Sequence, residues 1–282
     1  MKNQFKYRLN KLVFILTLFV QEKRVQRFYT KNKNEKLKYI ITENRRFLDS
    51  IEVFLAEDDY IKNDYGIQKR IYDQIDKPIS DYPTYSDFIV YLINNILKEK
   101  INYLEIGVSV LKNFMQINSG ISDANMVAYD INEINPNFNN LSSHAKNNNN
   151  LSYFKGSVLS QSDANKFRKA HPQKFNFIFS DALHTPEAIR SEYELIIKNS
   201  LDEEFILYYD DLDFEGLENE FNNIKSNISK LSNQKINFYT FSVFGWIGEN
   251  EKLHKNGIIT NIEIEELFSK DKLYIYKFKK IN

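Results

Sequence analysis

Two acids and a glycine are spaced in this chain as a nucleotide-type cofactor site requires. Glu105-Ile106-Gly107 ends an apolar run that begins at Tyr103, and Asp130 closes the next apolar run, Met126–Tyr129. A glycine at the first turn lets a cofactor approach the backbone, and a carboxylate about 20 residues later can accept hydrogen bonds from ribose hydroxyls. The spacing therefore predicts a cofactor site at the carboxyl ends of two neighbouring strands.

The number of glycines in this turn indicates which cofactor fits. A dinucleotide pyrophosphate rests on bare backbone at a helix N-terminus, and such sites have the pattern G-x-G-x-x-G. The run from Gly107 to Lys112 has its only glycine at the first position. A cofactor with adenosine and no phosphate lacks this requirement, so S-adenosylmethionine fits and NAD does not.

A second group of polar residues follows two later apolar runs. Asp181 and His184 come after Phe175–Ser180, and Asp210-Asp211 close Phe205–Tyr209. Adjacent strand ends would bring these groups together, where like charges repel unless a cation or a proton lies between them. Carboxylates with water suit Mg²⁺, which would lower the pKa of a bound hydroxyl. His184, with an ordinary pKa of about 6.5, could take the proton.

Each of these residues could also have a purely structural role. Glu105 fits a carboxylate paired with a nearby cation, and Asp130 fits an ordinary acid of a turn. Acids at the end of a strand can cap the next helix, as Asp213 would equally well. His184 would then bind backbone in its turn, and Gly156-Ser157 would be an ordinary turn pair.

With these motifs the chain resembles the class I S-adenosylmethionine-dependent methyltransferases. It is most similar to small-molecule O-methyltransferases in which E-I-G opens the domain and D-x-x-H and D-D follow, and the resemblance covers about Tyr85 to Phe278. The family often has a further glycine near Ser109 or Leu111, where this chain has none. The resemblance implies methyl transfer to a hydroxyl of a small molecule or a sugar.

The resemblance also assigns roles to individual residues. The cofactor-binding residues are Glu105, Gly107, Ser109, Asp130, Gly156, Ser157 and Asp181. The catalytic residues are His184 and Asp181, and the ligands of Mg²⁺ are Asp181, Asp210 and Asp211.

Two other functions stay open at this point. With Leu111 in place of a possible glycine, the chain could be a non-catalytic Rossmann-like binding or assembly module with a degenerate cofactor site. An NAD-dependent oxidoreductase is disfavoured by the single glycine of the turn. Lys and Arg together number 38, as do Asp and Glu, so no global field favours nucleic acid as a partner. Cysteine is absent, which excludes disulfides and fits a reducing compartment, and we expect a cytoplasmic protein.

Alternation of strand and helix patterns predicts an α/β fold, a Rossmann-like doubly wound sheet of seven strands that are mostly parallel. By the resemblance, the last strand is antiparallel. The strands are expected at Ile101–Ile106, Met126–Tyr129, Leu151–Lys155, Phe175–Ser180, Glu204–Tyr209, Ile236–Val243 and Lys272–Phe278.

Three further segments have specific expectations. Thr185 and Pro186 predict the start of a helix, and residues 215–231 predict another with Leu217, Phe221, Ile224 and Ile228 as its apolar stripe. The segment Phe244–Thr260 reads as a long connection that could form a lid or an acceptor wall, in which Trp246 is expected to pack and His254 has no evident partner.

The first 80 residues read as an N-terminal helical extension, and residues 81–282 as the methyltransferase domain. Helices are expected at Leu37–Glu57 and Ile67–Ile75, and Pro78 and Pro83 mark the boundary.

Leu12–Val20 is apolar on every face and flanked by cations. A helix of this length spans about 14 Å, short of a hydrocarbon core of about 30 Å. It is expected either to pack on the domain or on a partner subunit of a homo-oligomer, or to make peripheral contact with a membrane.

Overall fold

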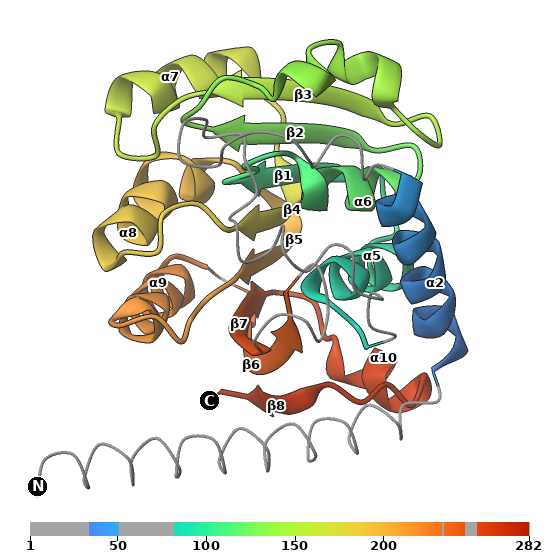
Figure 1. The fold of residues 1–282 in the computed structure, drawn as a ribbon. Coiled ribbons are helices and arrows are strands. Elements are labelled where there is room, and N and C mark those ends of the chain that lie inside the picture. Colours follow the sequence, from blue (N-terminus) through green and yellow to red (C-terminus); the bar gives the residue numbers. More distant parts are fainter. Residues whose placement is uncertain (1–33, 51–81, 233, 246–252, 282) are drawn as a thin grey trace, which may run out of the picture.

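The computed structural model describes residues 34–50, 82–232, 234–245 and 253–281 (Figure 1). Among these residues, eight strands form one sheet in the spatial order β3-β2-β1-β4-β5-β7-β6-β8. The strands are β1 Asn102–Ile106, β2 Asn125–Asp130, β3 Asn150–Lys155, β4 Phe175–Ser180, β5 Leu201–Tyr209, β6 Asn237–Phe244, β7 Leu253–Thr260 and β8 Tyr276–Lys280.

The first five strands are parallel, and strand order reverses between β1 and β4. β7 runs antiparallel to β5 and β6, and β8 runs antiparallel to β6 at the edge of the sheet. The predicted doubly wound, mostly parallel sheet with an antiparallel last strand is confirmed. The carboxyl ends of β1–β5 therefore meet at one edge, which is where ligands bind in such sheets.

The prediction of seven strands was wrong by one, because β7 lies within the segment expected to be a long connection. Its first half, Leu253-His254-Lys255-Asn256-Gly257, is mostly polar, so no alternating apolar pattern marks it as a strand. β5 and β6 on either side supply its hydrogen-bonding partners. A side chain at Gly257 would meet Leu212 and Phe221 at 2.6 and 2.7 Å, so close packing explains this glycine.

Two layers of helices cover the sheet (Figure 1). One layer consists of α2 Glu35–Ser50, α5 Tyr85–Ile96, α6 Lys112–Gly120 and α10 Glu265–Lys270, and the other of α7 Gln161–Ala170, α8 Pro186–Leu195 and α9 Leu217–Leu231. Short 3₁₀ turns lie at Pro136–Phe138, Leu141–His144 and Ile197–Asn199. Strand side chains alternate between the layers, as the period of two requires: Phe177 and Phe179 join the first core and Ile178 the second.

The predicted start of α8 and the predicted apolar face of α9 are confirmed, although α9 begins at Leu217 and not at residue 215. Thr185 Oγ1 accepts a hydrogen bond from the Ala188 N–H at the start of α8, and Pro186 occupies its first turn. The apolar stripe of α9 is buried against the sheet.

Within the predicted N-terminal extension, the described residues form the helix α2, which packs on α5 and α6. Leu37, Ile40 and Ile41 belong to the core of that layer, and Arg45 forms a 2.8 Å ion pair with the buried Asp87 of α5. The division at residue 80 stays a prediction, because residues 51–81 lie outside the described ranges.

Several other expectations fall on residues outside the described ranges. These are Leu12–Val20 with its protein or membrane contact, Ile67–Ile75, Pro78 and Trp246. Among the helices that are described, none has the length and apolar character needed to cross a bilayer.

Candidate functional site

The turn after β1 has the backbone conformation that a glycine-rich turn would give. Gly107 has φ of 89°, and a side chain there would lie 2.2 Å from the carbonyl oxygen of Asp181, so only glycine fits. Ser109 and Leu111, near the place where the resembling family often has another glycine, are also left-handed, with φ of 48° and 70°. Such a conformation costs a residue with a side chain roughly 1–2 kcal/mol. Ser109 and Leu111 thus have the left-handed conformation that a glycine would adopt without this cost.

Asp130 ties this turn to the end of β2. Its Oδ2 accepts a hydrogen bond from the Ser109 N–H at 2.9 Å, and its Oδ1 accepts one from the Asn132 N–H at 3.0 Å. A carboxylate has about four acceptor positions, so about two remain for a ligand. The acid is thus oriented by backbone groups while it keeps capacity to bind.

A cavity of about 310 Å³ lies at the carboxyl ends of β1 to β4. Six of the predicted cofactor-binding residues line it: Gly107, Ser109, Asp130, Gly156, Ser157 and Asp181. Among the described residues that line the cavity there is no lysine or arginine. The described lining thus combines the carboxylates of Asp130 and Asp181 with the backbone of two glycines and has no cationic side chain.

Three apolar residues at this cavity were missed by the sequence analysis. Ile131, Leu159 and Leu183 line it, and their exposed fractions are 62%, 55% and 50%. Each lies a few residues after a polar residue at the end of a strand. This position in the sequence could have identified it as part of the site. Exposed apolar side chains around a cavity favour a ligand with an apolar surface.

Glu105, the seventh predicted cofactor-binding residue, is not among the residues that line the cavity. Its carboxylate is buried and accepts hydrogen bonds from Tyr103 Oη at 2.6 Å and Asn113 Nδ2 at 2.9 Å. Burial raises the pKa of Glu105 to about 7, although these two hydrogen bonds oppose the shift. The described contacts of Glu105 are therefore internal, between β1 and the first turn of α6.

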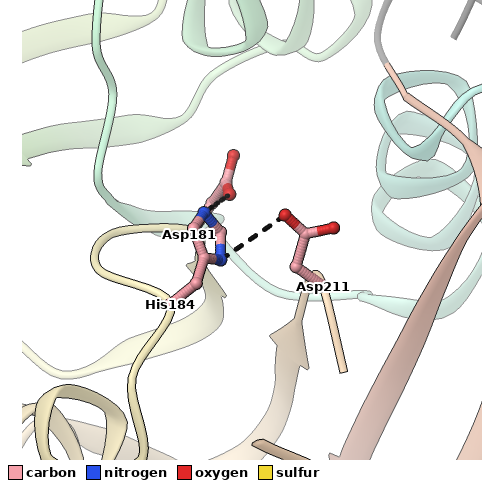
Figure 2. A group of neighbouring side chains, drawn as sticks. All are labelled: Asp181, His184 and Asp211. Carbon is pink, nitrogen blue, oxygen red and sulfur yellow. Dashed lines mark ion pairs between the residues drawn. The ribbon is translucent and has the colours of Figure 1, made fainter. Parts of the chain in front are cut away.

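Asp181, His184 and Asp211 form a cluster beside the cavity, with side chains 19%, 32% and 10% exposed (Figure 2). His184 Nε2 lies 3.8 Å from Asp181 Oδ1, and His184 Nδ1 lies 3.5 Å from Asp211 Oδ2. The Phe214 ring, itself 43% exposed, stacks on the imidazole at 5.1 Å. Burial raises the pKa of Asp181 well above its ordinary value, and the Asp210 and Asp211 carboxylates add to the rise.

A second cluster behind the first consists of Asp210, Asp211 and His254. His254 Nδ1 lies 2.5 Å from Asp211 Oδ1 and 3.5 Å from Asp210 Oδ2. Burial alone would lower the pKa of His254, but the Asp210 and Asp211 carboxylates outweigh it and raise the pKa to about 11. His254 therefore carries a positive charge between two acids at neutral pH, a partnership that was hidden because β7 was not predicted.

The three residues predicted to bind the metal ion do not all belong to one of these clusters. Asp211 belongs to both, whereas Asp181 and Asp210 belong to one each among the described residues. Asp210 Oδ1 accepts hydrogen bonds from Asn256 Nδ2 and from the Asp211 N–H, and its Oδ2 faces His254. Asp181 and Asp211 are the two predicted ligands that share a cluster, with His184.

No protein-family model matches the chain, and no curated protein matches it. Solved structures of methyltransferases do resemble it. An O-methyltransferase from Bacillus cereus, in complex with S-adenosylhomocysteine, has 14% identity and a TM-score of 0.47, with 79% of this chain and 100% of that chain covered. The plantazolicin methyltransferase, also in complex with S-adenosylhomocysteine, has 14% identity and a TM-score of 0.46, with 81% and 99% covered. Similarity at this level leaves the chemistry of this chain to be inferred from its own side chains.

Proposed function

We propose that the protein transfers the methyl group of S-adenosylmethionine to a hydroxyl of a small molecule or a sugar. The observation that carries the proposal is the position of Asp181, which lines the cavity and also belongs to the cluster with His184 and Asp211. A ligand in the cavity would end beside groups that can accept a proton. Methyl transfer to a hydroxyl needs this combination of a binding cavity and an adjacent base.

The cavity fits an adenosine cofactor better than a dinucleotide. Asp130 has acceptor capacity for ribose hydroxyls, and Ile131 and Leu159 offer apolar surface for a base. Ser109 and Lys112 stand where the dinucleotide pattern G-x-G-x-x-G has its second and third glycines, so their side chains would hinder the approach of a pyrophosphate to the backbone. When bound, S-adenosylmethionine supplies an electrophilic methyl group on a sulfonium.

His184 is proposed as the group that takes the acceptor's proton. As the acceptor oxygen bonds to the methyl carbon, the carbon–sulfur bond breaks with its electron pair on sulfur, and the hydroxyl proton must leave. His184 is partly exposed and lies within 4 Å of two carboxylates, which would stabilise the imidazolium that forms. Asp181 is the second catalytic residue of the proposal, placed between His184 and the cavity.

The proposal also includes a divalent metal ion that assists the transfer. Asp181 and Asp211 fit as ligands because their carboxylate oxygens lie within 4.8 Å of each other in one cluster, and carboxylate oxygens suit Mg²⁺. Asp210 fits less well, because Asn256, His254 and the Asp211 N–H contact its oxygens. The ion would lower the pKa of an acceptor hydroxyl bound to it.

Calorimetry with three ligands tests which cofactor the protein binds. We expect S-adenosylmethionine and S-adenosylhomocysteine to bind and NAD not to bind. Binding of NAD alone would contradict the proposal and favour an oxidoreductase. Absence of binding by all three would favour the non-catalytic assembly module instead.

A further inference from the structure

Asp211 is contacted by an imidazole at each of its carboxylate oxygens. Its backbone is left-handed, with φ of 54°, a conformation that aspartate tolerates better than most residues but that still costs free energy. Oδ2 faces His184 at 3.5 Å, and Oδ1 contacts His254 at 2.5 Å (Figure 2 shows the His184 side). The turn therefore directs this carboxylate to a position between two histidines.

His254 reaches Asp211 from a strand that runs against β5. It pairs with Val243 of β6, and its side chain is 9% exposed. The same Nδ1 lies 3.5 Å from Asp210 Oδ2. A rotation of the imidazole would take Nδ1 away from both carboxylates in a place that is largely closed to water. The two acids and the imidazole thus restrict one another.

Asp210 is fixed in turn by a polar chain that joins β5 and β7. Asn256 Nδ2 donates to Asp210 Oδ1, and Tyr208 Oη donates to Asn256 Oδ1 at 2.5 Å. Asn256 and Tyr208 are fully buried. Asp210 therefore gives His254 a rigid support on the side away from the cavity.

We propose that His254 is a positioning residue, which holds the Asp211 carboxylate in the orientation that faces His184. The inference rests on the proposed function in taking His184 as the proton acceptor. His254 acts through Asp211, because its own contacts are with the two acids. Without the imidazole, Asp211 loses its 2.5 Å contact at Oδ1, and its carboxylate can turn away from His184.

The ¹⁵N signals of the His184 imidazole at constant pH test this proposal. The chain has four histidines, so single substitutions assign every signal. Asp211→Asn gives the displacement expected when His184 loses its carboxylate partner. We expect His254→Leu to displace the His184 signals in the same direction as Asp211→Asn. We expect His254→Asn to leave them near the wild-type position, because its amide nitrogen can take the place of Nδ1.

Two further variants make the result decisive. His171→Gln is the matched control, because His171 packs on Phe167 at the end of α7, outside both clusters, and should leave the His184 signals unchanged. If His254→Leu does not fold, His254→Gln replaces it, because its amide lies farther from the backbone than Nδ1 does. Unchanged His184 signals in a folded Leu or Gln variant would overturn the positioning role.

Calorimetry with S-adenosylhomocysteine separates this proposal from the proposed function. Wild type that fails to bind S-adenosylhomocysteine would refute the function, whereas the His184 signals would still report on His254. Wild-type binding together with unchanged signals in the His254 variants would refute the positioning role alone.

Discussion

The two halves of the site are built in different ways. The cavity that we propose binds the cofactor is made mainly by strand ends and turns, and its acid, Asp130, is oriented by the backbone N–H groups of Ser109 and Asn132. The cluster that we propose accepts the proton is made by side chains that contact one another from the ends of β4 and β5 and from β7. A backbone-built site depends on local spacing, whereas a side-chain-built site depends on which strands lie beside each other. The first half should therefore tolerate substitution better than the second.

The largest expected effect is on methyl transfer, in the side-chain-built half. His184→Gln or Asp181→Asn should slow transfer of labelled methyl groups to a panel of hydroxylated small molecules and sugars by roughly 10²-fold or more. The affinity for S-adenosylhomocysteine should change much less in His184→Gln, because His184 is not among the residues that line the cavity. His171→Gln is the control. Full activity in both variants would show that the cluster is structural.

Removal of divalent ions should have an effect of similar size. EDTA should abolish transfer and Mg²⁺ should restore it, because an ion at Asp181 and Asp211 would acidify the acceptor. Asp211→Asn should weaken Mn²⁺ binding, measured by calorimetry, more than Asp210→Asn does, since other contacts engage Asp210. Full activity in EDTA would leave His184 as the base without an ion.

Glu105 provides a stability test in the backbone-built half. Its pKa is about 7 when folded and about 4.5 when unfolded, so the unfolded state releases its proton first. Stability should therefore fall as pH rises from about 4.5 to 7, by roughly 2–3 kcal/mol for this group. Glu105→Gln should raise the melting temperature relative to wild type at pH 8 more than at pH 5. Glu194→Gln, at a surface ion pair with Lys198, serves as the comparison, and equal effects of the two variants would contradict the assignment.

Asp130→Ala should weaken S-adenosylhomocysteine binding by about tenfold or more, because charge-assisted hydrogen bonds contribute roughly 1.5–3 kcal/mol. Asp202→Ala, at the start of β5 and so at the other end of the sheet, is the matched control. Unchanged affinity in Asp130→Ala would mean that the ribose lies elsewhere.

The smallest effect is expected at Ser109. Ser109→Gly should change cofactor affinity less than about twofold, because the backbone already has the left-handed conformation that a glycine would adopt. A large gain in affinity, measured by calorimetry, would show that the missing glycine does weaken the site.

The sequence by itself determined the order of strands and helices and the residues at the strand ends. Asp130, Gly107 and Asp181 could be placed from the sequence because apolar runs mark the parallel strands, and such strands put their carboxyl ends at one edge. The caps of α8 and the stripe of α9 follow from local spacing in the same way.

Only the tertiary structure decided which side chains contact Asp210 and which contact Asp211. β7 has a polar first half and is recognisable as a strand only because β5 and β6 pair with it. That pairing brings His254 to both Asp210 and Asp211 and Asn256 to Asp210, while the other oxygen of Asp211 faces His184. Glu105 was likewise expected at the cofactor, but contacts with Tyr103 and Asn113 bury it. Sequence spacing places a residue at the end of a strand, whereas the partner of its side chain depends on neighbours that are distant in the chain.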